Sequence, residues 1–149
     1  MSTDAQPLPH VLQVWDRIRA NSPIYAYLLD KVEIYHAEQS GVICARLRVG
    51  PQHVNSKNIL HGTVSACLMD FAGGLAIAAH GRSATGVSAD MHISFIGAAK
   101  EGDMLEIEGR TTRLGRNLAF TTVSIAKADA EGKRQPVAEG SHTKYVAQS

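Results

Sequence analysis

The stretch LHGTVSACLMDFAGGLAIAAHG, which runs from Leu60 to Gly81, decides the fold of this chain. Apart from one acid, Asp70, and a histidine near each end, it consists of apolar and small residues. A helix that is apolar around most of its circumference is normally buried, so a carboxylate within it loses hydration and must be compensated or used. The pattern therefore predicts a buried central helix over about residues 62–80, and it makes Asp70 the first residue to explain.

Length and composition limit the possible classes of protein. The 149 residues, 44% of them hydrophobic and 19% charged, are typical of one globular domain with a sizeable core. A formal charge of +1, without a block of like charge, gives no field that favours nucleic acid or a membrane surface. We therefore expect a single domain over residues 1–149 and no nucleic-acid partner, while a small ligand remains open.

A membrane span and an exported protein are both disfavoured. The apolar run over residues 62–79 approaches the length of a span, but Asp70 would lie near the bilayer centre at a cost of about 2.5 to 3.5 kcal/mol. The two cysteines, Cys44 and Cys67, lack metal-ligand spacing and favour a reduced intracellular chain. Because the N-terminus lacks a secretory signal, we expect a cytoplasmic protein, and a mitochondrial location stays open.

Alternating apolar and polar residues predict strands on both sides of the central helix. From Val87 to Phe95 every second residue is apolar, which is typical of a strand with one buried face. Similar patterns predict further strands over residues 29–37, 41–49, 105–108, 117–127 and 136–146, after an N-terminal helical segment over residues 1–28. Short connections imply an antiparallel sheet, and one curved sheet around one helix fits this order best. Pairing with a second copy would cover its edges and build clefts from two chains.

Several polar or glycine positions accompany the central helix at a distinctive joint spacing. They are Asn55, His61, Gly62, Asp70 and Ser88. In this arrangement the chain resembles the hotdog-fold acyl-CoA thioesterases of the PaaI-like group. The resemblance extends to about Tyr145 and includes GVSADMHISFIGAAKEGD, LGRNLAFTTVSI and AEGSHTKY. It departs at Thr63, where the family commonly has a second glycine after the histidine.

The resemblance implies an α+β hotdog fold and an acyl-CoA thioester hydrolase. The implied substrates are fatty (medium- or long-chain) or aryl-acetyl CoA thioesters, which are split into free acid and CoA. No cofactor is implied, since coenzyme A is part of the substrate, and the implied assembly is a homodimer that forms the active site, usually within a homotetramer. We predict no metal, because the histidines show neither HxxxH spacing nor His/Cys clustering.

The residues themselves suit thioester hydrolysis. Gly62 begins the predicted helix, where backbone amides lack intrahelical partners, so its N–H would polarise a thioester carbonyl. Asp70 lies about 12 Å further along, so the two cannot readily act on one thioester within one chain. The resemblance implies that Gly62 of one subunit faces the partner's Asp70. It also implies that Asn55 and His61 hold the carbonyl or its loop, that Asp70 activates water or attacks directly, and that Ser88 orients the water.

Each of these residues also has a structural interpretation. A buried Asp70 would cap backbone or pair with an arginine, His61 would be a helix N-cap, Ser88 a strand residue and Asn55 a turn residue. A different function is open as well, since a non-catalytic protein that binds or senses acyl-CoA would keep the same cleft. A hotdog hydratase is a weaker third possibility, because its acid/base pair is differently spaced.

The same resemblance places coenzyme A over residues 95–100, residues 113–118 and Tyr145. Cationic side chains suit its phosphates, and glycines let the backbone approach a ligand closely. The residues of this predicted surface are Phe95, Gly97, Lys100, Arg113, Gly115, Arg116 and Tyr145. Basic residues at hairpin ends are often simply solvated, so both interpretations stay open for each of them.

Overall fold

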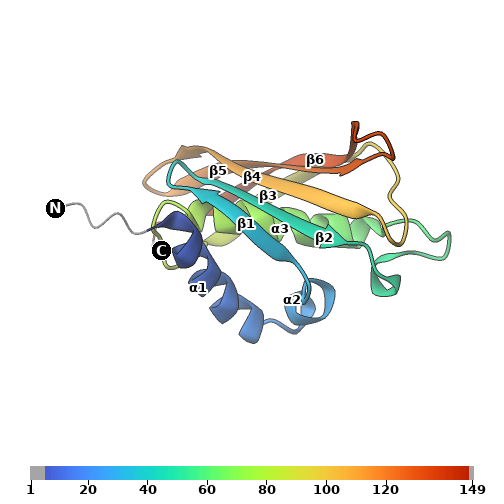
Figure 1. Ribbon diagram of the computed structural model, residues 1–149. Helices are drawn as coiled ribbons and strands as arrows, with labels where there is room; N and C mark the ends of the chain where they lie inside the picture. The colour runs from blue at the N-terminus through green and yellow to red at the C-terminus, as the bar shows by residue number, and fades with distance from the viewer. Residues whose placement is uncertain (1–5, 148–149) are drawn as a thin grey trace.

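In the computed structural model, which describes residues 6–147, one six-stranded antiparallel sheet curves around a long helix, α3 (Gly62–Ala78). Figure 1 shows α3 lying along the concave side of the sheet. The strands follow one another across the sheet in the order β1-β2-β4-β5-β6-β3. They are β1 (Glu33–Glu38), β2 (Val42–Arg48), β3 (Val87–Phe95), β4 (Met104–Leu114), β5 (Leu118–Ala128) and β6 (Arg134–Tyr145). The predicted α+β architecture is confirmed.

The core forms where α3 meets the inner face of the sheet. The helix is buried along most of its length and ends two residues before the predicted boundary. Its large apolar side chains, among them Leu68, Phe71 and Leu75, join those of β2, β4, β5 and β6 in one cluster. The backbones of α3 and β4 approach closely at Gly109, where a Cβ atom would overlap the carbonyl oxygen of Ala72. A residue without a side chain is therefore needed there.

We expect Gly109→Ala to lower the free energy of unfolding by about 1 to 3 kcal/mol, because α3 and β4 must move apart to admit the methyl group. Urea unfolding measures this change. Ala128→Val, which adds two methyl groups at an exposed position near the end of β5, is the control and should stay within about 0.5 kcal/mol of the parent protein. Equal effects of the two substitutions would contradict the close contact.

The N-terminal helical segment consists of two helices, α1 (Pro7–Ala20) and α2 (Pro23–Leu28), and residues 1–5 of the predicted segment lie outside the described residues. Trp15 of α1 joins both helices to α3, since its ring lies 5.3 Å from that of Tyr25 and 4.7 Å from that of Phe71. The first strand begins at Glu33 and not at Leu29 as predicted, because Leu29 is buried in the connection after α2.

The predicted buried face of β3 is confirmed only in part for the single protomer. Met91 and Ile93 are partly buried and pack against the core. Val87 is 70% exposed and Phe95 63% exposed, because β3 lies at the edge of the described sheet and pairs there with β6 on one side. The strand is also irregular, with a bulge between Ser88 and Asp90. An edge strand with exposed apolar side chains is suited to pairing with a further strand.

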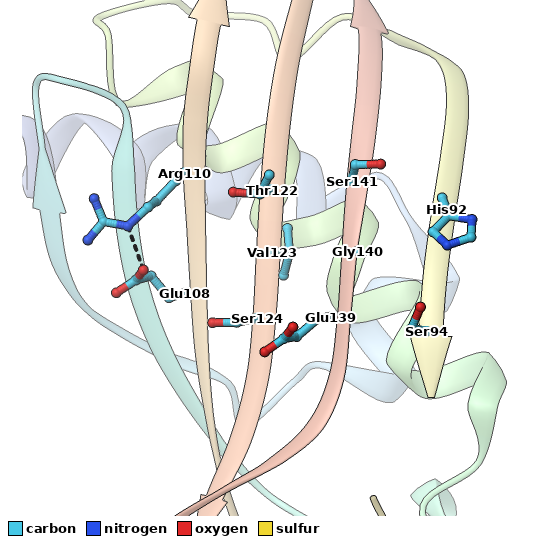
Figure 2. Close-up of a pocket in the computed structure, with 10 residues that line it drawn as sticks. All are labelled: His92, Ser94, Glu108, Arg110, Thr122, Val123, Ser124, Glu139, Gly140 and Ser141. Carbon is cyan, nitrogen blue, oxygen red and sulfur yellow. Dashed lines mark hydrogen bonds and ion pairs between the residues drawn. The ribbon is translucent and has the colours of Figure 1, made fainter. Parts of the chain in front are cut away.

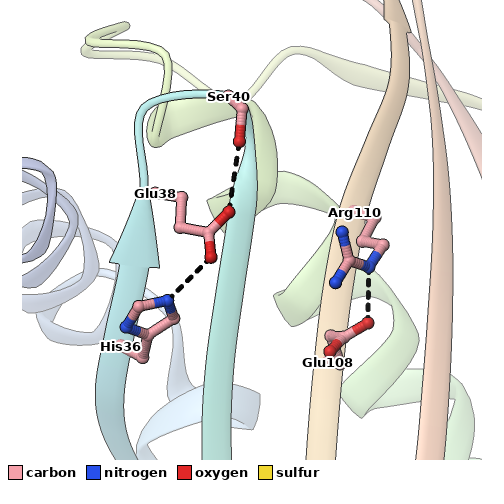
Figure 3. Close-up of polar contacts among 5 residues, drawn as sticks. All are labelled: His36, Glu38, Ser40, Glu108 and Arg110. Carbon is pink, nitrogen blue, oxygen red and sulfur yellow. Dashed lines mark hydrogen bonds and ion pairs between the residues drawn. The ribbon is translucent and has the colours of Figure 1, made fainter.

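The outer face of the sheet, which points away from α3, is polar. In Figure 3 the His36 ring contacts Glu38 at 3.0 Å and the Arg110 guanidinium contacts Glu108 at 2.6 Å. Exposed pairs of this kind contribute roughly 0 to 1 kcal/mol each, so the inner core stabilises the fold.

Within residues 6–147, every helix is too short or too polar to cross a membrane.

Candidate active site

The N-terminal end of α3 opens into a groove of about 400 Å³, and Gly62 forms part of its wall. His61 is the N-cap of the helix, and its Nδ1 accepts a hydrogen bond of 3.0 Å from the Thr63 amide. The structure thus bears out the N-cap interpretation of His61 and gives the Thr63 amide a partner. A Cβ on Gly62 would lie 3.3 Å from the Phe95 ring, so the lack of a side chain leaves the approach to the Gly62 amide open. Phe95 and Gly97 line the same groove.

Asn55 lies in the loop before α3 and acts there as a turn residue. Its Oδ1 accepts hydrogen bonds from the backbone amides of Lys57, at 2.9 Å, and Ile59, at 3.2 Å. Because Oδ1 is used to hold the loop, the side-chain amide Nδ2 is the group of Asn55 that suits a ligand carbonyl.

Asp70 is less buried than expected, with a side chain that is 41% exposed. Neighbouring elements cover only part of it. The hydroxyl group of Tyr25, from α2, donates a hydrogen bond of 2.8 Å to Oδ2. On the other side, Nε2 of His142 lies 3.9 Å from Oδ1, which is too long for a direct hydrogen bond. Asp70 is therefore flanked by a tyrosine and a histidine, and not by the arginine that the structural alternative offered.

Ser88 and His142 complete a polar cluster beside Asp70. Ser88 Oγ and His142 Nε2 lie 2.7 Å apart, and the His142 side chain is fully buried. Burial, assisted by the positive charge of Lys144, lowers the pKa of His142, so its ring is neutral near pH 7. The three side chains come from α3, β3 and β6, and they bring a carboxylate, a hydroxyl group and an imidazole ring together.

His142 and Lys144 were not predicted as site residues, since no sequence motif singles them out. The signal that relates to both is the pair Gly73-Gly74. A Cβ on Gly73 would lie 3.0 Å from the His142 ring, and one on Gly74 would lie 3.3 Å from the Lys144 ammonium. The two glycines therefore make room on α3 for the inward side chains of β6. Burial lowers the pKa of Lys144, and the nearby Asp70 charge opposes that shift.

The pKa of His142 predicts a pH dependence of stability. A histidine with a lowered pKa in the folded protein takes up its proton more readily in the unfolded chain, whose pKa is near 6.5. The free energy of unfolding should therefore fall as the pH drops below that value. We expect His142→Gln to reduce this slope by at most about 1.4 kcal/mol per pH unit, as urea unfolding at several pH values would measure. An unchanged slope would contradict the shift.

The predicted coenzyme A residues fall at two separate ends of β3. Phe95 and Gly97 lie near Gly62, and the exposed Lys100 pairs with Ile59 in an isolated β-bridge. At the other end, Tyr145 pairs with Val87. The β4–β5 hairpin at that end holds Arg113, Gly115 and Arg116. Since nine extended residues span about 26 to 30 Å, one protomer does not bring the two sets together.

A groove of about 450 Å³ on the outer face of the sheet is a separate feature (Figure 2). Its walls include Glu108, Arg110 and Glu139, and neither Gly62 nor Asp70 lines it. The groove therefore lies apart from the predicted catalytic residues.

Among residues 6–147, no three His, Cys, Asp or Glu side chains come close enough together to hold a metal ion.

Comparison with known proteins gives the family. The thioesterase superfamily matches residues 57–132. Acyl-coenzyme A thioesterase 13 of Mus musculus is 33% identical over 146 residues, which cover 98% of this chain and 99% of the mouse protein. The chain therefore belongs to the thioesterase superfamily.

Solved structures give the same result for the fold. Zebrafish thioesterase superfamily member 2 superimposes with a TM-score of 0.76 at 39% identity, covering 87% of this chain and 91% of that one. A hypothetical thioesterase protein from Streptococcus pneumoniae, solved with coenzyme A, gives a TM-score of 0.70 at 26% identity, covering 78% of this chain and 86% of that one. The hotdog fold expected from the resemblance is confirmed.

Proposed function

We propose that this protein hydrolyses acyl-CoA thioesters to a free acid and coenzyme A. The observation that carries the proposal is the pair of sites along α3. The helix N-terminus at Gly62 borders a groove, and further along the helix the Asp70 carboxylate lies beside His142, which contacts Ser88. The name of the mouse relative, an acyl-coenzyme A thioesterase, supports this function, as does the coenzyme A in the S. pneumoniae structure. The proposed acyl groups are fatty (medium- or long-chain) or aryl-acetyl.

We also propose that the active site needs two copies of the chain. When a twofold axis perpendicular to a sheet joins two identical edge strands, the strands run antiparallel. With Met91 near that axis, the Val87 end of one β3 lies beside the Phe95 end of the other. Because Asp70 is near the first end and Gly62 near the second, this pairing places the partner's Asp70 opposite Gly62. The exposed apolar side chains of β3 support such a contact.

The proposed reaction uses this arrangement directly. The Gly62 amide, with Asn55 Nδ2, donates hydrogen bonds to the thioester oxygen and stabilises the negative charge that develops on it. A water molecule held by the partner's Ser88 gives a proton to the partner's Asp70, and the water oxygen attacks the carbonyl carbon. When the carbon–sulfur bond breaks, that proton passes to the departing sulfur. In the alternative route the Asp70 carboxylate attacks the carbonyl carbon directly, the thiolate of coenzyme A leaves, and water then hydrolyses the mixed anhydride to the free acid and the Asp70 carboxylate. Neither route requires a metal or a further cofactor.

The same dimer unites the two halves of the predicted coenzyme A surface. Phe95, Gly97 and Lys100 of one protomer would lie beside the Tyr145 end of its partner. Arg113 and Arg116, in the hairpin at that end, are exposed and suit the phosphates of coenzyme A. We further propose that two such dimers assemble into a homotetramer and that the protein is cytoplasmic.

Thiol release from a panel of acyl-CoAs, from short to long chains and including phenylacetyl-CoA, tests the function. Turnover of at least one substrate is the expected result, and the preferred substrate identifies the acyl class. Binding should be measured on the same panel. If the protein binds acyl-CoA and releases no thiol from any member, the hydrolase proposal fails and the binding or sensing function replaces it.

A further inference from the structure

The contact between Tyr25 and Asp70 joins the N-terminal helices to the proposed active site. Tyr25 is half-buried, and its hydroxyl group donates to Oδ2 of Asp70 at 2.8 Å. Burial, together with the negative charge of Asp70, raises the pKa of Tyr25, so the phenol keeps its proton and remains a donor. The motif shared with the thioesterases begins near Asn55 and does not include this tyrosine.

The helix that carries Tyr25 is fixed at both ends. At its start, Ser22 is the N-cap and its hydroxyl oxygen accepts from the Tyr25 amide at 3.4 Å. At its end, the carbonyl of Leu28 accepts a hydrogen bond of 2.6 Å from Nε2 of His53, a buried side chain. The Trp15 ring packs against the Tyr25 ring from the side. A six-residue helix with these contacts presents the phenol to Asp70 in one orientation.

The two oxygens of the Asp70 carboxylate therefore differ. Oδ2 accepts the hydrogen bond from Tyr25, whereas Oδ1 lies 3.9 Å from Nε2 of His142, the ring nitrogen that contacts Ser88. We propose that Tyr25 is a positioning residue, which holds Oδ2 so that Oδ1 is the oxygen that receives the proton of the attacking water. This role rests on the proposed hydrolase function.

Other titratable groups around Asp70 affect its protonation as well. Lys144 and His142 face it from β6, and Cys67 lies one turn earlier on α3. Removal of the Tyr25 hydroxyl leaves these three groups in place. The change in activity with pH can therefore be assigned to the lost hydrogen bond.

Tyr25→Phe tests the role, with Tyr27→Phe as a matched control on the same helix, because Tyr27 is 66% exposed. We expect kcat for Tyr25→Phe to fall about 10-fold with little change in KM, since the carboxylate is held less well but the substrate contacts remain. A hydrogen bond to the ionised carboxylate favours that form, so the acid limb of the kcat/KM profile should move to higher pH by about half a unit or more. Tyr27→Phe should match the parent protein.

The outcomes separate this inference from the proposed function. Phenylalanine keeps the ring contact with Trp15, so a thermal melt should show that Tyr25→Phe is folded. If the parent protein turns over acyl-CoA and Tyr25→Phe retains the same kcat and the same pH profile, the positioning role is wrong while the hydrolase function stands. If the parent protein shows no turnover at all, the proposed function fails and the role of Tyr25 fails with it.

Discussion

Asp70→Asn is expected to bind acyl-CoA as well as the parent protein does and to hydrolyse it at least about 100-fold more slowly. Asparagine keeps the shape of the side chain, and its amide oxygen can still accept the Tyr25 hydrogen bond. It cannot take a proton from water or form an acyl intermediate, however. The loss should therefore appear in kcat and leave binding almost unchanged, as thiol release and direct titration with acyl-CoA would show.

A matched control makes this result specific. Asp16→Asn removes a carboxylate from α1, where the Asp16 side chain is 68% exposed and contacts Arg19. This variant should keep full activity. If Asp70→Asn keeps more than about a tenth of the parent activity, Asp70 is neither the base nor the nucleophile, because removal of either group costs more than that.

The largest relative change in activity is expected when two variants that are each inactive, Gly62→Val and Asp70→Asn, are mixed. Gly62→Val would crowd the approach to the Gly62 amide, since even a Cβ there lies 3.3 Å from the Phe95 ring. In a heterodimer of Gly62→Val and Asp70→Asn, one site keeps both native residues and the other keeps neither. After random exchange of subunits, half the dimers are heterodimers, and about a quarter of the parent activity should return.

This mixing experiment has an internal control. The double variant Gly62→Val/Asp70→Asn, mixed with either single variant, contains no site with both native residues and should recover nothing. Subunit exchange can be followed with differently tagged chains. If exchange is complete and the two single variants still recover no activity, Gly62 and Asp70 do not act across a shared interface.

Local patterns were sufficient to predict most of the elements. The apolar run around Asp70 predicted α3, and alternation predicted the strands, because burial on one face imposes a fixed period along the chain. Thioester chemistry was expected from the resemblance that Asn55, Gly62 and Asp70 carry to the hotdog-fold thioesterases. The prediction for β3 was correct in its bounds but wrong about the burial of Val87 and Phe95, since periodicity cannot show whether a strand lies at the edge of a sheet.

Contacts between distant segments were not predictable in this way. His142 reaches Ser88 because β3 and β6 pair in one particular register, and the bulge between Ser88 and Asp90 changes which way neighbouring side chains point. Tyr25 reaches Asp70 because Trp15 and His53 hold α2 in place, and none of these contacts leaves a periodic trace in the chain.

The sequence by itself determined the central helix, the strands and the acid at the middle of the helix, because each depends on neighbours within a few residues. The tertiary structure decided which groups face that acid and how much water reaches it. Partners such as Tyr25 and His142 lie 45 and 72 positions away from it along the chain. Only the packing of α2 and the pairing of β6 bring them within reach, and this depends on the whole core.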